Sequence, residues 1–190
     1  EGYHVFGLDF NLLPTADYTY FRTDEKHLDL EEIFCENQFE VCINAAGSGS
    51  VSLSFEDPFE DFKANCFDCI RILEVIRKRV PACKYLHISS AAVYGNPTLL
   101  PIREDALTVP VTPYGWNKLI SESICKEYFS IYGVGIAIVR PFSVYGDGLR
   151  KQIFWDICSK LKLADNVQLF GSGNETRDFI HVLDLCRLML

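Results

Sequence analysis

The sequence has little methionine, no long apolar run and no excess of positive charge. Its single methionine is Met189, and the chain opens on Glu1. The longest apolar runs, such as Val134–Val139, are far shorter than the roughly 20 residues that span a bilayer. A formal net charge of −8 is opposite to the basic face that binds nucleic acids and anionic membranes. We therefore expect neither nucleic acid nor membrane as a partner.

The eight cysteines show no disulfide or zinc pattern. Only Cys66 and Cys69 form a CxxC, and no second CxxC or histidine pair completes a metal-ligand set. A redox-active CxxC normally opens a helix, whereas this one lies in the interior of a predicted helix. We expect reduced, mostly buried thiols, a cytoplasmic protein and no metal site.

Short apolar runs alternate with longer amphipathic segments, which predicts an α/β fold. Strands are expected within residues 3–10, 18–23, 39–47, 84–90, 134–142 and 167–171, and helices over 28–37, 59–80, 114–133 and 151–161. Helices between strands act as crossover connections and give a largely parallel sheet. Apolar strands such as "VCINAA" predict a sheet that is covered on both faces. Ligands of such sheets bind at the carboxyl ends of the strands, so the residues after each strand are the candidates for chemistry.

Two of these strand ends suit a dinucleotide. Asp9 ends the first strand, where an acidic residue accepts hydrogen bonds from the adenosine ribose hydroxyls. No arginine directly follows Asp9 to hold a 2′-phosphate, so NAD is favoured over NADP. Ala45, Ala46 and Gly47 end a later strand, where their small side chains would let a cofactor lie against the backbone. A simple tight turn is the alternative interpretation of that segment.

Tyr114 and Lys118 lie one helical turn apart in "TPYGWNK", just after Pro113. The spacing alone suits an ordinary helix start as well as a proton-transfer pair. Ser89 and Ser90 end the strand at 84–90, where Ser90 would meet Tyr114 across the cleft. Spacing therefore makes these residues candidates without deciding between the two interpretations.

Four segments, "ISSAAVYG", "TPYGWNK", "RPFSVYG" and "RDFIHVLDL", resemble in order and spacing the extended short-chain dehydrogenase/reductases that act on nucleotide sugars. Within this NAD-dependent epimerase/dehydratase family they are most similar to the UDP-glucose 4-epimerases. The resemblance covers nearly the whole chain. It implies a Rossmann-type doubly wound parallel sheet that binds NAD over residues 1–142, and the start of a smaller C-terminal substrate-binding region over 143–190.

The family begins with a strand and a glycine-rich turn, GxxGxxG, which this sequence lacks. We therefore expect the natural protein to continue at both ends, with a further βα unit of about 30 residues at the front. The resemblance also implies a nucleotide-diphosphate sugar as partner and a homodimer formed through the long helices.

Ser90, Tyr114 and Lys118 match the catalytic Ser/Thr, Tyr and Lys of the family. A free tyrosine titrates near pH ~10, and we expect Lys118 and the positive nicotinamide to lower that value. Tyr114 would then take a proton from a sugar hydroxyl while hydride leaves the same carbon for NAD+. Ser90 would hydrogen-bond the reacting oxygen and orient it.

The resemblance assigns further residues to the cofactor and the substrate. Besides Asp9 and Ala45 to Gly47, the cofactor contacts are Asp24, Asn65, Ser89, Tyr114, Lys118 and Pro141, and the substrate contacts are Ser90, Ala91, Ser143 and Arg177. Helix capping by Asp24, a merely polar helix position for Asn65, and a salt bridge of Arg177 with Asp178 or Asp184 are the alternatives. Ser143 stands where 4-epimerases usually have asparagine, which leaves the particular sugar open.

Several reactions remain open within the family. Dehydratases carry an Asp-Glu pair where this chain has Ala91 and Ala92, which offer no acid or base, so dehydration is disfavoured. Epimerisation at carbon 4 is the favoured reaction, with decarboxylation and 4-reduction as alternatives. A non-catalytic NAD-binding sensor is the competing class, although such proteins typically lose the tyrosine or the lysine.

Overall fold

The computed structural model describes residues 2–10, 18–22, 30–163, 166–169 and 171–190, and within them the strands pair in parallel. Strand β1 (Phe6–Asp9) pairs with β2 (Thr19–Arg22), and β6 (Ser143–Tyr145) pairs with β7 (Phe179–His181). The third sheet has the order β3 (Val41–Asn44), β4 (Lys84–Ile88) and β5 (Ile136–Val139). Neighbouring strands run parallel within each sheet, so the predicted α/β architecture with a parallel sheet is confirmed.

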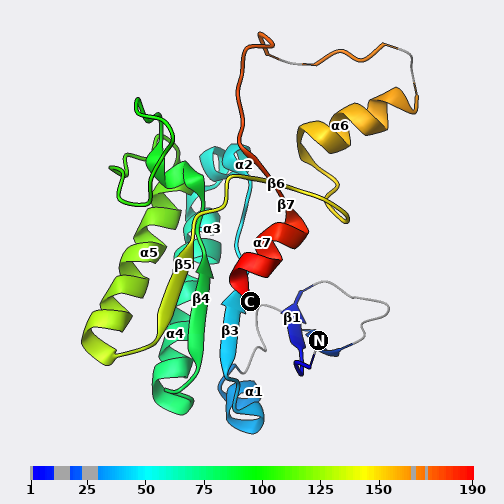
Figure 1. Cartoon of the computed structure of the whole chain (residues 1–190). Helices are drawn as coiled ribbons and strands as arrows, with labels where there is room; N and C mark the ends of the chain where they lie inside the picture. Colours follow the sequence, from blue (N-terminus) through cyan, green and yellow to red (C-terminus); the bar gives the residue numbers. More distant parts are fainter. Residues whose placement is uncertain (1, 11–17, 23–29, 164–165, 170) are drawn as a thin grey trace.

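Helices lie between β2 and β3, between β3 and β4, between β4 and β5, between β6 and β7, and after β7. Their bounds are α1 Leu30–Asn37, α2 Val51–Glu56, α3 Pro58–Phe62, α4 Asp68–Arg79, α5 Pro113–Tyr132, α6 Gln152–Leu161 and α7 Val182–Met189. A π-helical segment, η1 (Lys63–Phe67), joins α3 to α4, and a short 3₁₀ helix, η2 (Ala91–Tyr94), follows β4. The helix predicted over 59–80 is therefore present, with a wider turn in its middle. Figure 1 shows α4 and α5 side by side against the sheet of β3, β4 and β5.

Helix α5 has clear start and stop signals. The Thr112 hydroxyl accepts a hydrogen bond from the backbone N–H of Gly115 at 3.0 Å, and Pro113 occupies the first turn, where its missing N–H does no harm. Gly133 closes the helix with a φ of +70°, a conformation that favours glycine. Because both ends are fixed, the start of α5 is held in place beside β4.

The core lies between β4, α4 and α5. It is built from side chains that are almost fully buried, among them Cys69, Leu73, Ile76, Tyr85, Cys125 and Tyr128. Burial of this apolar surface is the main stabilising contribution. It also fixes the carboxyl end of β4 relative to the first turn of α5, which is where the candidate site lies.

Two expectations about the fold are wrong, and one helix was not predicted. Residues 167–169 form no strand, and residue 170 lies outside the described residues. The face of β3 is not covered as predicted, because Val41 and Ile43 are 53% and 42% exposed. Helix α2 was not foreseen, since the serines that alternate with apolar residues in "VSLSFE" disguise its period.

The cysteines are all free thiols, and Cys66 and Cys69 lie inside a helix as predicted. The expectation that most are buried is only half right. Cys66, Cys69, Cys83 and Cys125 are buried, whereas Cys35 and Cys158 are exposed on α1 and α6. Both α1 and α6 present several side chains to solvent, so a cysteine on them is not forced into the core. In the described parts of the chain, no helix has both the length and the apolar character needed to cross a bilayer.

Candidate active site

Ser90, Tyr114 and Lys118 are brought together at the carboxyl end of β4. Ser90 follows the strand, and its hydroxyl accepts a hydrogen bond from the backbone N–H of Ala92 at 3.2 Å. Tyr114 lies in the first turn of α5. Lys118 is buried, and its Nζ atom lies 5.9 Å from the centre of the Tyr114 ring and donates a hydrogen bond to the Ile88 carbonyl oxygen at 3.0 Å. An orienting hydroxyl, a phenol and an ammonium group thus share one location.

Gly115 allows the first turn of α5 to approach this strand end closely. A Cβ atom at this position would lie 2.8 Å from the backbone oxygen of Ala92, which is too close for any side chain. The contact joins α5 directly to η2 and brings Tyr114 toward Ser90. A second anchor was not foreseen from the sequence, because the backbone N–H of Tyr114 donates to the buried hydroxyl of Ser54 in α2 at 3.1 Å.

Burial dominates the electrostatics of Tyr114. It raises the pKa of the phenol, and a side-chain hydrogen bond with Ser90 opposes this while the charge of Asp61 adds to it. Burial also lowers the pKa of Lys118, against the opposing charges of Cys69 and Asp61. The pKa of Tyr114 in the chain by itself is thus raised, and not lowered as expected, because loss of solvent is the largest contribution.

The end of β3 presents a small, open backbone surface. Ala45, Ala46 and Gly47 are exposed there, and Gly47 has a φ of +119°. A Cβ atom at Gly47 would lie 2.6 Å from Oδ1 of Asn65, so glycine is required. The Ala46 N–H donates to the Asn44 side chain at 3.1 Å, which makes the segment a tight turn as well as an open surface.

Asn65, on η1, is buried below this turn. Its Nδ2 atom donates to the backbone oxygens of Asp61 at 2.9 Å and Ser48 at 3.4 Å. Its Oδ1 atom is buried and has no hydrogen-bond partner in the described part of the chain. A buried amide oxygen without a donor is costly, so this atom is suited to accept a hydrogen bond from a bound group.

Asp61 is a site residue that the sequence did not reveal. It is only 3% exposed, and its Oδ2 atom accepts a hydrogen bond from Nδ2 of Asn117 at 2.7 Å. Its Oδ1 atom, like that of Asn65, is buried without a partner in the residues that are described. The signal that was available was an acidic residue one helical turn before Asn65.

A buried ion pair supports the strand end from behind. Glu122 is fully buried and accepts hydrogen bonds from the Arg140 guanidinium at 2.6 and 2.8 Å and from the Ser89 hydroxyl at 2.6 Å. Arg140 also donates to the Tyr94 hydroxyl at 2.8 Å. The Ser89 hydroxyl thus donates a hydrogen bond to Glu122. Ser89 therefore belongs to the network that supports the end of β4.

The segment after β5 contacts the site through its backbone. The carbonyl oxygen of Pro141 accepts a hydrogen bond from the N–H of Ala91 at 3.0 Å, which fixes the start of η2. On the far sheet Asp9 ends β1, is exposed, and lies beside Arg22 in the parallel register. Asp24 lies outside the described residues.

The residues expected to meet substrate lie on the β6–β7 side. Ser143 begins β6 and its N–H donates to the carbonyl oxygen of Asp178 at 3.0 Å. Arg177 is exposed and donates to the carbonyl oxygen of Thr176, while Asp184 pairs with Arg187 at 2.8 Å. The guanidinium of Arg177 therefore faces solvent near the start of β7.

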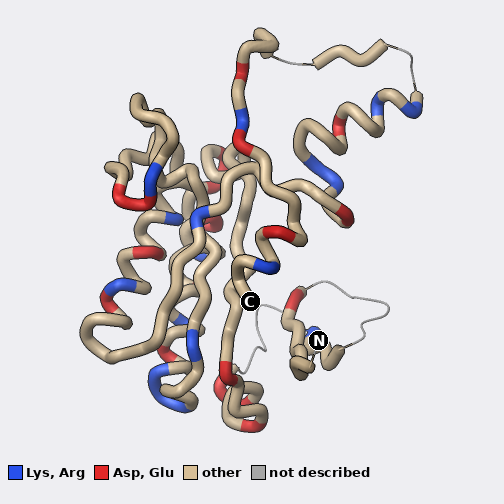
Figure 2. Tube along the Cα trace, viewed as in Figure 1, with Lys and Arg blue, Asp and Glu red and all other residues tan. Residues whose placement is uncertain are grey.

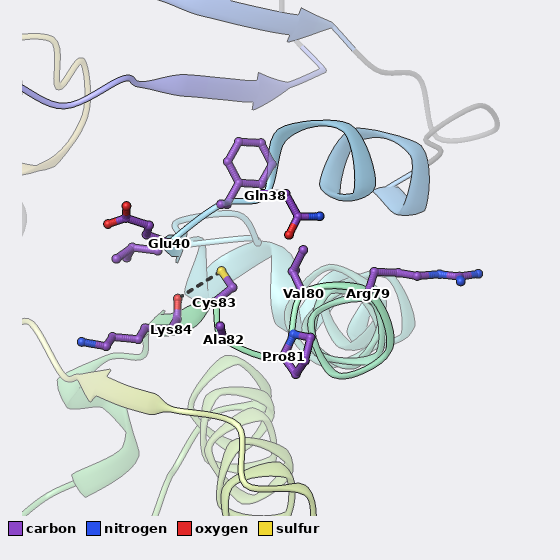
Figure 3. Close-up of a pocket in the computed structure, with 10 residues that line it drawn as sticks. Gln38, Glu40, Arg79, Val80, Pro81, Ala82, Cys83 and Lys84 are labelled. Carbon is purple, nitrogen blue, oxygen red and sulfur yellow. Dashed lines mark hydrogen bonds between the residues drawn. The ribbon is translucent and has the colours of Figure 1, made fainter.

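A hollow of about 370 Å³ lies at the opposite end of the sheet and is not this site. Figure 3 shows that Gln38, Glu40, Arg79 and Lys84 surround it, with Cys83 between them. Figure 2 marks the basic last turn of α4 at the same end of the molecule. Ligands of parallel sheets bind at the carboxyl ends of strands, so this hollow is on the wrong side for the chemistry of Ser90, Tyr114 and Lys118.

A parallel α/β sheet, with a Ser, a Tyr and a Lys gathered near the carboxyl end of β4, defines a Rossmann-like domain. The chain belongs to the NAD dependent epimerase/dehydratase family, whose model matches residues 10–190.

Known proteins support this placement in sequence and in structure. The chain is 35% identical over 185 residues to a putative UDP-glucose 4-epimerase of Methanocaldococcus jannaschii. This match covers 95% of the chain and 60% of that protein. It is 30% identical to the UDP-glucose 4-epimerase of Mycolicibacterium smegmatis, over 97% of the chain and 64% of the relative. The chain thus spans less than two thirds of the length of these relatives.

Among solved structures, a UDP-glucuronic acid 4-epimerase from Bacillus cereus, in complex with UDP-glucuronic acid and NAD, superposes with a TM-score of 0.86. It is 27% identical, and the match covers 97% of this chain and 63% of that one. The UDP-glucose 4-epimerase of Thermotoga maritima, with UDP-glucose, also gives a TM-score of 0.86 at 26% identity, over 98% and 64% of the two chains.

Proposed function

We propose that the protein is an NAD-dependent nucleotide-sugar epimerase that transiently oxidises carbon 4 of the sugar. The observation that carries this proposal is the meeting of Ser90, Tyr114 and Lys118 at the end of β4. A non-catalytic NAD-binding sensor has no use for a phenol, a hydroxyl and a buried ammonium group in one place, and burying a lysine is costly.

The three side chains divide the proton chemistry between them. Tyr114 takes the proton of the sugar hydroxyl as the carbon is oxidised and returns it when the carbon is reduced. Ser90 orients the reacting oxygen, and Lys118 supplies positive charge beside the phenol ring. NAD, when bound, accepts the hydride from carbon 4 and gives it back. Burial raises the pKa of Tyr114, and the positive charge of a bound nicotinamide beside the phenol would act against that rise.

Features of the β1 and β3 ends fit the cofactor. The exposed Ala45, Ala46 and Gly47 leave room for a dinucleotide against the backbone, and the buried Oδ1 atom of Asn65 offers an unused acceptor beside them. Asp9 is exposed at the end of β1, where it would receive the ribose hydroxyls. These residues therefore suit NAD on chemical grounds.

The substrate would lie between η2 and the β6–β7 region. Residues 143–190 form part of that substrate-binding region in our proposal, and residues 1–142 the NAD-binding domain. Ala91, Ser143 and Arg177 would contact the nucleotide sugar, with the exposed guanidinium of Arg177 on its diphosphate. Ala91 and Ala92 provide no acid or base, which favours epimerisation over dehydration.

The proposal extends to the whole protein. The β1–β2 pair and the β3–β4–β5 sheet are separate, and they touch where the rings of Phe6 and Phe39 meet at 5.1 Å. A parallel strand between β1 and β3 would join the two sheets and lead into the glycine-rich turn.

A homodimer is also proposed, through the neighbouring helices α3 and α5. Their exposed apolar side chains support it, among them Phe59 and Phe62 on α3 and Trp116 and Ile120 on α5. Sedimentation of the full-length protein, with Trp116→Glu as the disrupting variant, tests this part separately from the chemistry.

The function is tested by turnover of a substrate panel. Full-length protein with NAD+ is mixed with UDP-, dTDP-, GDP- and CDP-sugars, and epimer formation is followed by chromatography. Epimerisation of at least one sugar supports the proposal. NAD binding without turnover of any of them favours the sensor, and release of a dehydrated or decarboxylated sugar favours the other reactions of the family.

A further inference from the structure

Two cysteines and a histidine from three different elements meet in the core. Cys69 of α4, His87 of β4 and Cys125 of α5 are 0%, 1% and 0% exposed. Their ligand atoms all lie within 4.8 Å of one another, and the two sulfur atoms are 3.9 Å apart. Apolar residues would fill this space at less cost than three polar groups, so the cluster calls for an explanation.

The hydrogen bonds around His87 determine which of its nitrogens is free. The Ser121 hydroxyl donates its single proton to the carbonyl oxygen of Lys118 at 2.8 Å. Ser121 must therefore accept from Nε2 of His87, which lies 2.9 Å away. The proton is thus on Nε2, and Nδ1 carries the lone pair, 3.4 Å from the Tyr85 hydroxyl oxygen.

Tyr85 completes the ring of donors and acceptors. Its hydroxyl accepts from Nδ2 of Asn44 at 2.7 Å, donates to the Cys69 sulfur at 3.4 Å, and lies 3.4 Å from Nδ1 of His87. The Tyr85 hydroxyl thus lies against two of the three members of the cluster.

We propose that Cys69, His87 and Cys125 bind one zinc ion, with the Tyr85 hydroxyl as the nearest fourth donor. Tetrahedral zinc with Zn–S bonds of about 2.3 Å separates two sulfur ligands by about 3.8 Å, and the two thiols already stand 3.9 Å apart. Two thiolates and one Zn²⁺ add to zero charge, so the bound site places no net charge in the core. The Nε2–Ser121–Lys118 chain is the outer hydrogen bonding that orients a metal-binding histidine.

The CxxC of the sequence is not the chelating pair. Cys66 donates to the backbone oxygen of Asn117 at 3.1 Å and so belongs to a different contact. Cys69 instead finds its partner 56 positions along the chain. This explains why the sequence predicted no metal site: the three ligands converge only when α4 and α5 pack on β4.

Because the site is fully buried, zinc would enter during folding and tie α4, β4 and α5 together. The test is therefore done on refolding. Full-length protein is unfolded in guanidinium with a reductant and a chelator, then refolded in metal-free buffer, with Zn²⁺, or with Co²⁺. Metal content is measured by mass spectrometry, and the absorption spectrum of the cobalt sample is recorded.

We expect close to one zinc per chain and a higher melting temperature with zinc. The cobalt sample should show a thiolate-to-metal charge-transfer band and the strong visible bands of tetrahedral Co²⁺. Cys125→Ser and His87→Gln should each lose zinc, whereas Cys83→Ser, which removes a buried thiol of the same core outside the cluster, should retain it.

The cobalt spectrum keeps the test decisive if a variant fails to fold, because it needs only the wild-type chain. Absence of metal and of the cobalt bands in folded wild-type protein would overturn the proposal. None of these readouts depends on epimerase activity, so the zinc site and the proposed function can fail separately.

Discussion

The Nζ atom of Lys118 donates a hydrogen bond to the backbone oxygen of Ile88 at 3.0 Å, and this bond ties α5 to the last residue of β4. Lys118 is only 5% exposed, so its long side chain is held in one place. The ammonium group is thereby fixed near the Tyr114 ring, 5.9 Å from its centre. Lys118 therefore holds α5 against β4 and also places a positive charge beside the Tyr114 ring.

Replacement of Lys118 by methionine keeps the length of the side chain and removes the charge. We expect kcat to fall by about 10²–10⁴-fold, the range associated with loss of acid–base assistance, because the phenol loses its neighbouring cation. Lys126→Met on the exposed face of the same helix is the matched control and should leave kcat within a factor of roughly two of wild type. Equal losses in both variants would show that the effect is not local to the site.

Gly115→Ala tests the close contact between α5 and η2. The new methyl group would meet the Ala92 backbone oxygen at 2.8 Å, and that oxygen cannot move without shifting η2. We expect a loss of about 1–3 kcal/mol in the free energy of unfolding, together with a fall in kcat. Gly135→Ala, whose nearest neighbouring atom is 3.6 Å away, should be tolerated. Denaturant melts and initial rates measure both; a Gly115→Ala protein as stable and active as wild type would rule out the contact.

The buried pair of Glu122 and Arg140 should govern acid stability. Burial alone would raise the pKa of Glu122, but the hydrogen bonds from Arg140 and Ser89 outweigh it, and the pKa lies below its ordinary value of 4.5. A carboxyl whose pKa is lower in the folded state stabilises the fold above its unfolded pKa. That stabilisation is lost as the pH falls below about 4.5 and through the folded pKa.

Glu122→Gln should therefore destabilise the protein at pH 7, by about 3–5 kcal/mol, because Arg140, whose side chain is only 17% exposed, loses the carboxylate that it pairs with. The difference from wild type should shrink below pH 4.5, where the wild-type carboxyl also loses its charge. Glu127→Gln, at an exposed position of the same helix, is the control. Urea melts at several pH values measure the difference, and one that stayed constant with pH would contradict this role of Glu122.

Asp61 should set the pH dependence of the reaction. Its negative charge raises the pKa of Tyr114, so Asp61→Asn should lower that pKa. The limb of kcat/KM that rises as the base deprotonates should then move to lower pH. Asp57→Asn is the control. Asp57 caps α3 by accepting a hydrogen bond from the Glu60 N–H at 3.0 Å, and asparagine is an equally good cap. A shift in the opposite direction, or the same shift in both variants, would show that Asp61 does not tune the phenol.

Much of the fold could be predicted because its signals are local. Pro113 and Gly133 mark the ends of α5, and the apolar runs identify β4 and β5 within a few residues. The apolar run expected to be a strand forms none over 167–169, and such a run becomes a strand only where another strand pairs with it. Helix α2 has its own signal in Ser50, whose hydroxyl accepts from the Leu53 N–H at 3.3 Å, and that signal was overlooked.

The site was less predictable than the fold, since most of it depends on contacts between distant residues. Ser90, Tyr114 and Lys118 could be predicted as site residues because they stand in recognisable sequence motifs. The buried acceptors of Asp61 and the proton state of His87 depend on packing, which no spacing reveals. The pKa of Tyr114 was misjudged for the same reason, because the degree of burial is known only once α5 is packed.

The central claim is that carbon 4 is oxidised and reduced by the same hydride while Tyr114 moves the proton. The most direct measurement uses a UDP-sugar that carries deuterium on carbon 4, with full-length protein and NAD+. We predict that the epimer retains this deuterium, and that Tyr114→Phe slows its formation by about 10²–10⁴-fold while Tyr132→Phe does not. Loss of the deuterium to solvent, or unchanged turnover by Tyr114→Phe, would contradict the claim.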